Sequence, residues 1–353
     1  MPDYDPFARG PHAAAVVTVE LERGERRLPV ELWYPASEGY ADLDLNEATR
    51  DSYEILPGLP AVFQDAVRDA SPRKGKFPLV AFSHGYGGHR RQSTFLCTHL
   101  ASHGYVVAAV DHTGNTVQNV LEAVVAQQSG RPFTDPFTVL RQYAELRPGD
   151  VSFMIDRVLD DAGELAANID PERIGMMGHS FGGWTTLAVT GRDPRIRAAL
   201  PLAPAGGTNP ITTPNTFSLD FRWGRDVPTL FIVADRDTLL PLAGMRELYA
   251  QTQSTKRMVV LRNTDHLHFC DRVEEQHEMF RTLPPDPLFK EIQASIPPIT
   301  EFCAGSDAQL AVRVLGLAHM DAHLKGDESA ARFLAGDLPA TLATHGVTID
   351  VTS

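Results

Sequence analysis

A serine framed by glycines is the feature of this sequence with the clearest capacity for chemistry. Ser180 lies at the centre of Gly178-His179-Ser180-Phe181-Gly182, directly after the apolar run Ile174 to Met177. A GxSxG pattern at a strand-to-helix corner needs small neighbours because the turn is tight, and it leaves the serine hydroxyl exposed. Such a hydroxyl can attack a carbonyl carbon. Ser180 is therefore the candidate nucleophile, and an ordinary glycine-rich turn is the alternative.

A serine hydroxyl needs a base to take its proton and an acid to orient that base. Two segments further along the chain offer these groups, Asp235-Arg236-Asp237 and Asp265-His266-Leu267-His268, each directly after an apolar run or a short turn that follows one. We prefer Asp237 to Asp235 because it lies further beyond the strand end. We prefer His266 to His268 because it comes first after its strand. Asp235 as a turn cap and His268 as a pocket wall are the alternatives.

The elements that position these residues alternate between strands and helices. Residues 13–21 and 27–34 predict an antiparallel hairpin, and residues 35–76 are polar and irregular. Strands of this kind separated by helices predict a mainly parallel α/β sheet with helices on both faces. The predicted strands are 77–82, 105–110, 174–177, 198–202, 228–234 and 258–261, and the predicted helices are 91–102, 117–127, one from Asp150, 181–190, 242–251 and a final one at 307–324.

We expect one domain over residues 1–353, since no linker or repeat divides the chain. Two irregular inserts, 205–226 and 281–305, leave the sheet at the carboxyl ends of strands, where α/β proteins bind ligands. They could form a small cap. Phe217, Phe221 and Trp223 in the first insert are either the core of that cap or a wall of an acyl pocket.

These motifs together resemble the α/β-hydrolases of the dienelactone hydrolase and platelet-activating-factor acetylhydrolase group. The resemblance rests on segments 82–88, 100–112 and 178–183 and extends from Phe77 to Lys325. It implies the α/β-hydrolase fold, a triad in the order Ser180, Asp237, His266, and ester hydrolysis through an acyl-enzyme. It also implies an oxyanion hole made by the backbone N–H groups of Tyr86 and Phe181, which agrees with the need of an anionic tetrahedral oxygen for two donors.

The sequence departs from the animal acetylhydrolases in one respect. Those enzymes carry their acid directly after the strand that follows the nucleophile helix, and here that place is Pro201-Leu202-Ala203-Pro204. Asp237, one strand later, matches the position used by bacterial esterases and polyester hydrolases. Phospholipid specificity is therefore not expected to follow from the resemblance.

Other histidines and aromatic residues are candidates for supporting roles. His84 is expected to organise the oxyanion loop, and His179 is too close to Ser180 in the chain to act as its base. His112 ends a strand at the active-site edge, where it contacts substrate or anchors a loop. Trp184 is expected in the core more than in the pocket. The candidate pocket residues are His112, Trp184, Phe217, Trp223 and His268.

Composition and charge exclude several other functions. Lys and Arg number 32 and Asp and Glu 45, a net charge of −13 that argues against binding nucleic acid or anionic lipid without specificity. Cys97, Cys270 and Cys303 are too scattered for a disulfide framework, and no apolar run predicts a signal peptide or a membrane span. We therefore expect a cytoplasmic protein.

The sequence predicts a serine carboxylesterase that needs no cofactor. His266 and His268 with Asp235 or Asp237 offer metal-binding groups, but their spacing lacks a helical pair and the triad already explains them, so no metal is predicted. The substrate is a small-molecule or polymeric ester. A polyester hydrolase, an amidase or a thioesterase shares the same triad, and a catalytically silent binding protein is the alternative from another class.

Overall fold

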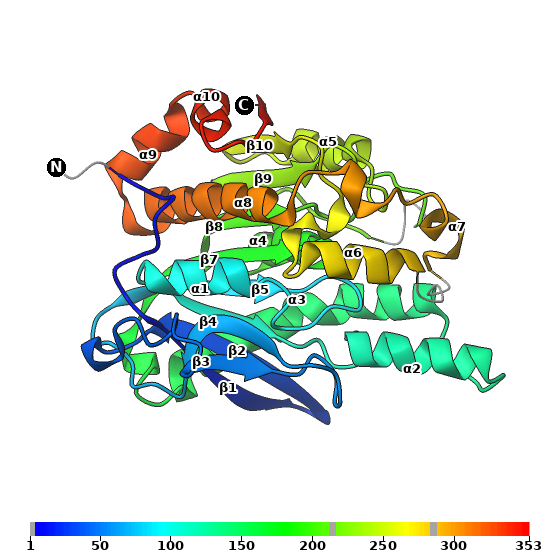
Figure 1. The fold of residues 1–353 in the computed structure, drawn as a ribbon, viewed down its shortest axis with the longest axis horizontal. Coiled ribbons are helices and arrows are strands. Elements are labelled where there is room, and N and C mark those ends of the chain that lie inside the picture. Colours follow the sequence, from blue (N-terminus) through cyan, green and yellow to red (C-terminus); the bar gives the residue numbers. More distant parts are fainter. Residues whose placement is uncertain (1–3, 212–216, 283–287, 353) are drawn as a thin grey trace.

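A twisted mixed sheet forms the centre of the molecule (Figure 1). The computed structural model describes residues 4–211, 217–282 and 288–352. Within these residues, eleven strands pair in the order β11-β10-β9-β8-β7-β5-β6-β2-β1-β4-β3, and the neighbours from β10 to β6 are parallel. The strands are β1 (Ala14–Arg23), β2 (Arg26–Pro35), β3 (Arg50–Tyr53), β4 (Val62–Arg68), β5 (Phe77–Ser83), β6 (Val106–Val110), β7 (Ile169–His179), β8 (Ile196–Leu202), β9 (Thr229–Ala234), β10 (Lys256–Leu261) and β11 (Ile349–Thr352).

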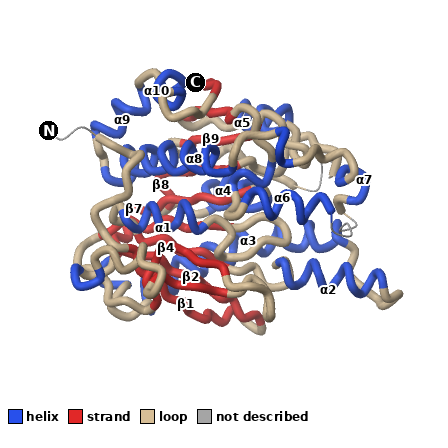
Figure 2. Tube along the Cα trace, viewed as in Figure 1, coloured by secondary structure: helices blue, strands red, loops and turns tan. Residues whose placement is uncertain are grey.

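Helices cover both faces of the sheet, as predicted. Figures 1 and 2 show α1 and α8 on the near face and α3 and α4 on the far face. Among the described residues, no helix has the length and apolar character needed to cross a membrane. The helices are α1 (Thr94–Ser102), α2 (Val117–Gln128), α3 (Pro136–Asp161), α4 (Phe181–Arg192), α5 (Leu242–Gln251), α6 (Val273–Thr282), α7 (Lys290–Gln293), α8 (Gly305–Met320), α9 (Glu328–Ala335) and α10 (Leu338–Ala343).

The predicted N-terminal hairpin is present as β1 and β2, which pair antiparallel down to Arg23 and Arg26. Residues 35–76 were expected to be irregular, and that prediction was wrong. They contain β3 and β4, and β4 pairs with β1. Their inward positions include the polar residues Asp51 and Gln64, which are buried and hydrogen-bonded to each other at 2.6 Å. Buried polar residues hide the alternation of apolar side chains that indicates a strand.

The helix expected to start at Asp150 begins fourteen residues earlier, at Pro136. Asp135 caps it by accepting a hydrogen bond from the Thr138 amide at 2.9 Å. Pro148 and Gly149, which directly precede the expected start, lie inside the helix. Proline removes one helical hydrogen bond, and the buried stripe on this helix outweighs that loss. Asp150 is consequently a buried residue inside this helix and does not begin it.

The chain does not end with the helix predicted at 307–324. That helix is α8 followed by one wide turn at Asp321–Lys325, and beyond it come α9, α10 and β11. β11 pairs antiparallel with β10 and extends the sheet by one strand. The two inserts contain little regular structure. In the described part of 205–226 there is neither helix nor strand, and the described part of 281–305 holds α7 and a short turn at Ile299–Glu301, while 212–216 and 283–287 lie outside the described residues.

Candidate active site

Ser180 occupies a strained turn between β7 and α4. Its backbone has φ 60° and ψ −117°, a conformation that non-glycine residues rarely adopt. A Cβ on Gly182 would lie 1.8 Å from the Ser83 carbonyl oxygen, and one on Gly178 would lie 2.4 Å from that of Gly182. Both glycines are therefore required by contact with backbone. The tight turn between β7 and α4 places Ser180 at the carboxyl edge of the sheet.

The structure brings His266 and Asp237 together from the ends of two neighbouring strands. His266 begins a short turn of helix after β10, and Asp237 lies in the loop after β9. The Nδ1 of His266 lies 2.7 Å from the Asp237 carboxylate. The other Asp237 oxygen accepts from the amides of Leu239 and Leu240 at 3.0 and 2.7 Å. This carboxylate is fixed on both sides and orients the imidazole.

The surroundings of His266 suit it to accept a proton. Burial lowers the pKa of the imidazole, but the adjacent Asp237 carboxylate more than offsets this, so that the pKa lies above its ordinary value. Because Nδ1 faces the carboxylate and donates to it, Nε2 is the basic nitrogen of the neutral ring.

The loop that carries His266 is held against the turn that carries Ser180. His179, the residue before Ser180, donates from Nε2 to the His266 carbonyl oxygen at 3.0 Å, and the two rings lie 4.6 Å apart. Within the described residues the Ser180 hydroxyl makes no hydrogen bond, including none to the His266 imidazole. Catalytic hydrogen bonds often shorten only when substrate is bound.

The same loop is anchored at its far end by Asp271. Its carboxylate accepts from the Thr94 amide and hydroxyl, both at 2.7 Å, and from the Phe95 amide at 3.1 Å. These are the first residues of α1, so Asp271 caps that helix from 176 to 177 residues away in the chain. Burial raises the pKa of Asp271 to about 6.

The alternative acid and base have other partners. Asp235 accepts from the Thr264 amide at 3.2 Å and lies 3.4 Å from Arg262, as expected for a turn-capping residue. His268 accepts from the Asp265 amide and donates to the Cys303 carbonyl oxygen at 3.1 Å. Both nitrogens of His268 are thus engaged by backbone, which favours Asp237 and His266 for the triad.

The predicted oxyanion donors lie at the start of α4 and in the loop after β5. Phe181 is the first residue of α4, where a backbone N–H has no acceptor within the helix. Tyr86 lies in the turn that the Gly88 amide closes on the Gly85 carbonyl at 3.2 Å. The Tyr86 ring packs edge-on against Phe289 of the second insert, with centroids 5.9 Å apart. That insert therefore borders the oxyanion loop.

Comparison with known proteins places this chain among hydrolases of similar sequence and fold. Residues 23–130 match the model for platelet-activating factor acetylhydrolase, isoform II, and residues 148–281 match that for PET hydrolase-like proteins. A solved ferulic acid esterase from Streptomyces cinnamoneus has a TM-score of 0.61 and 26% identity, and the match covers 90% of this chain and 92% of that one. The chain has the α/β-hydrolase fold and is similar to esterases of that fold. The predicted fold is confirmed.

Curated relatives of this α/β-hydrolase include cutinases and acetylhydrolases. Cutinase est1 of Thermobifida alba is 30% identical over 207 residues, which are 57% of each chain. Platelet-activating factor acetylhydrolase of Canis lupus familiaris is 25% identical over 225 residues, or 56% of this chain and 48% of that one. This chain thus spans about half the length of the curated relatives it matches.

A second series of serine, histidine and aspartate in this α/β-hydrolase was not predicted. Ser83 Oγ lies 2.9 Å from His112 Nε2, and His112 Nδ1 lies 3.0 Å from the Asp150 carboxylate. All three side chains are fully buried, and Arg26 completes the series on Asp150 at 2.7 and 2.9 Å. Burial lowers the pKa of His112 to about 4. His112 therefore anchors a loop and does not line a pocket that substrate can enter.

The predicted aromatic pocket residues fall into two separate groups. Phe181, Trp184 and Phe217 pack together with centroids 5.0 to 5.5 Å apart and are nearly buried, which agrees with a core role for Trp184. Trp223 instead packs at Gly191, near the far end of α4. Gly191 is eleven helical steps from Ser180, a rise of about 16 Å. The prediction of Trp223 as a pocket residue is not supported by this placement.

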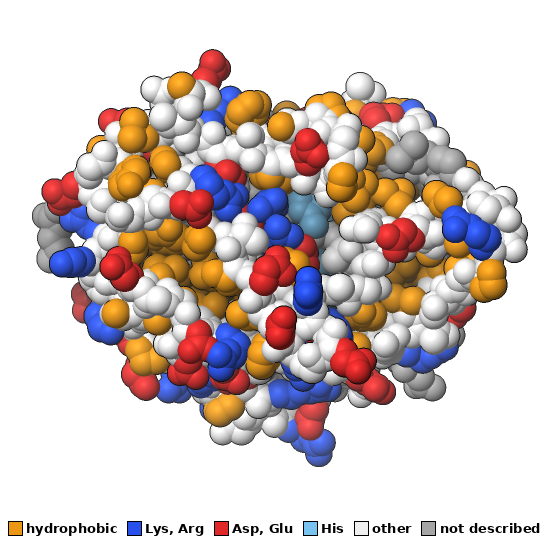
Figure 3. All heavy atoms as spheres, turned by 90° about the horizontal axis from the view of Figure 1, so that it is seen from below, with side chains coloured by type: hydrophobic (Ala, Val, Ile, Leu, Met, Phe, Trp, Pro, Cys, Tyr) orange, Lys and Arg blue, Asp and Glu red, His pale blue; other side chains and the backbone are white. Residues whose placement is uncertain are grey.

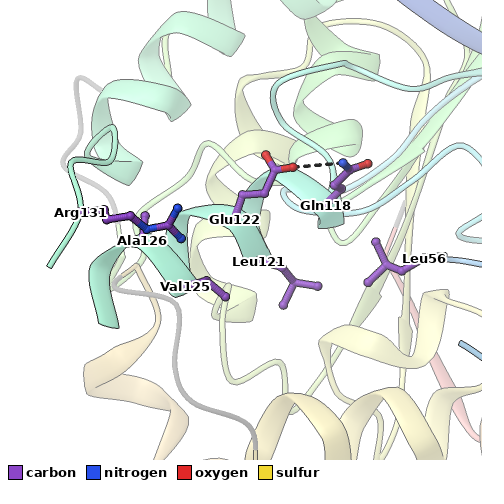
Figure 4. A pocket seen from close by; sticks show the side chains of 7 residues that line it. All are labelled: Leu56, Gln118, Leu121, Glu122, Val125, Ala126 and Arg131. Carbon is purple, nitrogen blue, oxygen red and sulfur yellow. Dashed lines mark hydrogen bonds between the residues drawn. The ribbon is translucent and has the colours of Figure 1, made fainter. Parts of the chain in front are cut away.

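An apolar groove runs along α2 of this α/β-hydrolase. Its volume is about 480 Å³, and Figure 4 shows Leu121 and Leu56 facing each other across it. α2 is joined to the oxyanion loop, because the Val117 amide donates to the Gly88 carbonyl at 3.0 Å. Figure 3 shows hydrophobic side chains gathered in patches on the face seen from below. The lining residues are Leu56, Gln118, Leu121, Glu122, Val125, Ala126 and Arg131.

Proposed function

We propose that this protein hydrolyses carboxylic esters through an acyl-enzyme on Ser180. The observation that carries the proposal is the 2.7 Å hydrogen bond between His266 and Asp237 on a loop that is bonded directly to the Ser180 turn. The cutinase, acetylhydrolase and ferulic acid esterase relatives support the same class of reaction.

In this mechanism each residue has one role. Ser180 Oγ attacks the acyl carbon while His266 Nε2 takes its proton, and Asp237 stabilises the imidazolium. The backbone N–H groups of Tyr86 and Phe181 hold the negative oxygen of the tetrahedral intermediate. Collapse of the intermediate breaks the bond to the alcohol, which leaves with the proton from His266. Water then attacks the acyl-enzyme by the same route and releases the acid and Ser180.

Esters with long apolar chains or polyester surfaces are a second, narrower candidate for the substrate. The groove along α2 is bordered by exposed apolar side chains, including Leu121 and Val125, and the first residue of α2, Val117, is bonded to the oxyanion loop. A chain bound there would remove apolar surface from water, at about 25 cal/mol per Å².

The nucleophile is tested by hydrolysis of p-nitrophenyl acetate and butyrate. We expect Ser180→Ala to abolish turnover while the far-ultraviolet circular dichroism stays native. A fluorophosphonate probe should label the wild-type protein once, at Ser180. The matched variant Ser83→Ala should still be labelled, because Ser83 is buried. Turnover by Ser180→Ala, or loss of labelling in a folded Ser83→Ala protein, would refute the assignment.

A further inference from the structure

Outside the triad, a buried arginine, Arg147, is hydrogen-bonded to the backbone of the oxyanion loop. We infer that Arg147 is a positioning residue that strengthens the oxyanion hole by polarising the peptide bond between Gly85 and Tyr86. The inference rests on the proposed function and adds a residue that neither the sequence motifs nor the triad identifies.

Arg147 donates to three acceptors, none of them charged. From α3 its guanidinium reaches the carbonyl oxygen of His84, that of Gly85 at 3.0 Å, and Asn115 Oδ1 at 2.6 Å. The side chain is fully buried, and across the described ranges no carboxylate lies within ion-pair distance of it. Buried arginines usually pair with carboxylates. The positive charge of Arg147 is instead directed at the loop.

The Gly85 carbonyl belongs to the same peptide group as the Tyr86 N–H. A hydrogen bond to a carbonyl oxygen withdraws electron density from its amide, so the N–H becomes a stronger donor. His84 adds a second donor to this carbonyl. Its Nε2 accepts from the His112 amide at 3.1 Å, so a neutral ring carries its proton on Nδ1, which donates to the Gly85 oxygen at 2.7 Å. The Gly85 carbonyl thus receives two side-chain donors, from Arg147 and His84, in addition to the Gly88 amide that closes the turn.

Arg147 also contacts the side chain of Phe181, the residue whose N–H is the second oxyanion donor. Its guanidinium carbon is 4.2 Å from the centre of the Phe181 ring. Burial lowers the pKa of Arg147 to about 9, although Asp150 opposes this, so the group remains cationic at neutral pH. Asp150, the nearest carboxylate on α3, is itself bound by Arg26 and His112. A fixed cation in a region without bulk water stabilises an anion that forms nearby.

Two substitutions separate charge from anchoring. Arg147→Gln removes the cation but keeps an amide donor. Asn115→Asp keeps the hydrogen bond to Arg147 and places a carboxylate on the guanidinium, so it neutralises the charge without releasing the loop. Arg141→Gln, on the exposed face of the same helix, is the matched control. Arg147→Lys tests whether a retained charge restores function.

The readouts are kcat and KM for p-nitrophenyl butyrate and the affinity for a trifluoromethyl ketone, which forms a tetrahedral oxyanion on Ser180. Losing a direct oxyanion donor costs 10²- to 10³-fold, so we expect about 10- to 100-fold from Arg147→Gln, mainly in kcat, with a parallel loss of ketone affinity. Asn115→Asp should lower both quantities without lowering Tm. Arg147→Lys should recover part of the loss.

Two results would overturn the inference. The first is that Asn115→Asp and Arg147→Gln both keep kcat within twofold of the wild type. The second is that the losses follow only the fraction of protein that fluorophosphonate can label, which would indicate a structural role. Absence of Ser180-dependent turnover and labelling in the wild type would refute the proposed function itself, and this inference with it.

Discussion

The Nε2 of His179 donates a hydrogen bond to the carbonyl oxygen of His266 at 3.0 Å. His179 Nδ1 in turn accepts from Gln92 at 2.9 Å, and the amide oxygen of Gln92 accepts from the Gly85 amide at the same distance. One line of hydrogen bonds therefore joins the oxyanion loop, the turn that carries Ser180 and the loop that carries His266. The three parts of the site keep their spacing through Gln92 and His179.

Gln92→Leu should weaken this line. It leaves the Gly85 amide buried without its partner, at about 1–3 kcal/mol, and leaves His179 Nδ1 only its 3.8 Å contact with Cys270 Sγ, so we expect a lower free energy of unfolding and a lower kcat. Urea denaturation and hydrolysis of p-nitrophenyl butyrate measure the two effects. Gln92→Glu, which keeps the acceptor for Gly85, should lose less stability. Equal stability of Gln92→Leu and the wild type would contradict the role.

The pH dependence of kcat/KM should report on His266. Activity needs the neutral imidazole, and Asp237 holds the pKa of His266 above its ordinary value, so kcat/KM should rise with pH through a midpoint above 6.5. Asp237→Asn removes the raising charge. Its profile should shift to lower pH, and kcat should fall by about 10⁴-fold. Asp235→Asn is the control, and equal losses in both variants would move the acid elsewhere.

Gly182→Ala should destabilise the fold, because the added Cβ would collide with backbone. The added Cβ would lie 1.8 Å from the Ser83 carbonyl oxygen, and neither β5 nor α4 has room to shift in a packed core. We expect a loss of about 3 kcal/mol or more in the free energy of unfolding. Gly39→Ala, whose Cβ would meet nothing within 4 Å, should differ from the wild type by less than about 1 kcal/mol. A stable Gly182→Ala protein would contradict the geometry of the turn.

A role of the groove along α2 in binding long chains is tested by comparing activity on a long and a short substrate in one variant. Leu121→Asp places a charge on the apolar wall, so the ratio of activity on polyester film to activity on p-nitrophenyl acetate should fall by several-fold. Glu122→Gln, also in the lining, removes a charge and should not lower the ratio. An unchanged ratio in Leu121→Asp would exclude the groove as a binding site for long chains.

The pairing of Asp237 with His266 was predictable because parallel strands share an edge. Asp237 and His266 each follow a strand in the half of the sheet where such ends meet, so their order and position were enough to select them. Arg147 and Gln92 gave no comparable signal. A single arginine or glutamine on a helix is usually solvated, and only contacts with distant segments show that these two are buried.

The missed elements have a related cause. β3 and β4 bury polar side chains, and Pro148 interrupts the local pattern of a helix whose length is determined by packing against the sheet. The four-residue β11 is too short to indicate a strand by itself, and it exists through its pairing with β10.

The internal Ser83–His112–Asp150 series bears on how active sites are recognised from coordinates. A template search for hydroxyl, imidazole and carboxylate at bonding distance would select this trio, because its two contacts of 2.9 and 3.0 Å are complete while Ser180 stands unbonded. Solvent access separates the two serines, and so does the backbone, since Ser180 has a positive φ and Ser83 does not. Of these two serines, Ser83 has the complete series of hydrogen bonds, yet it is the one that no ester can reach.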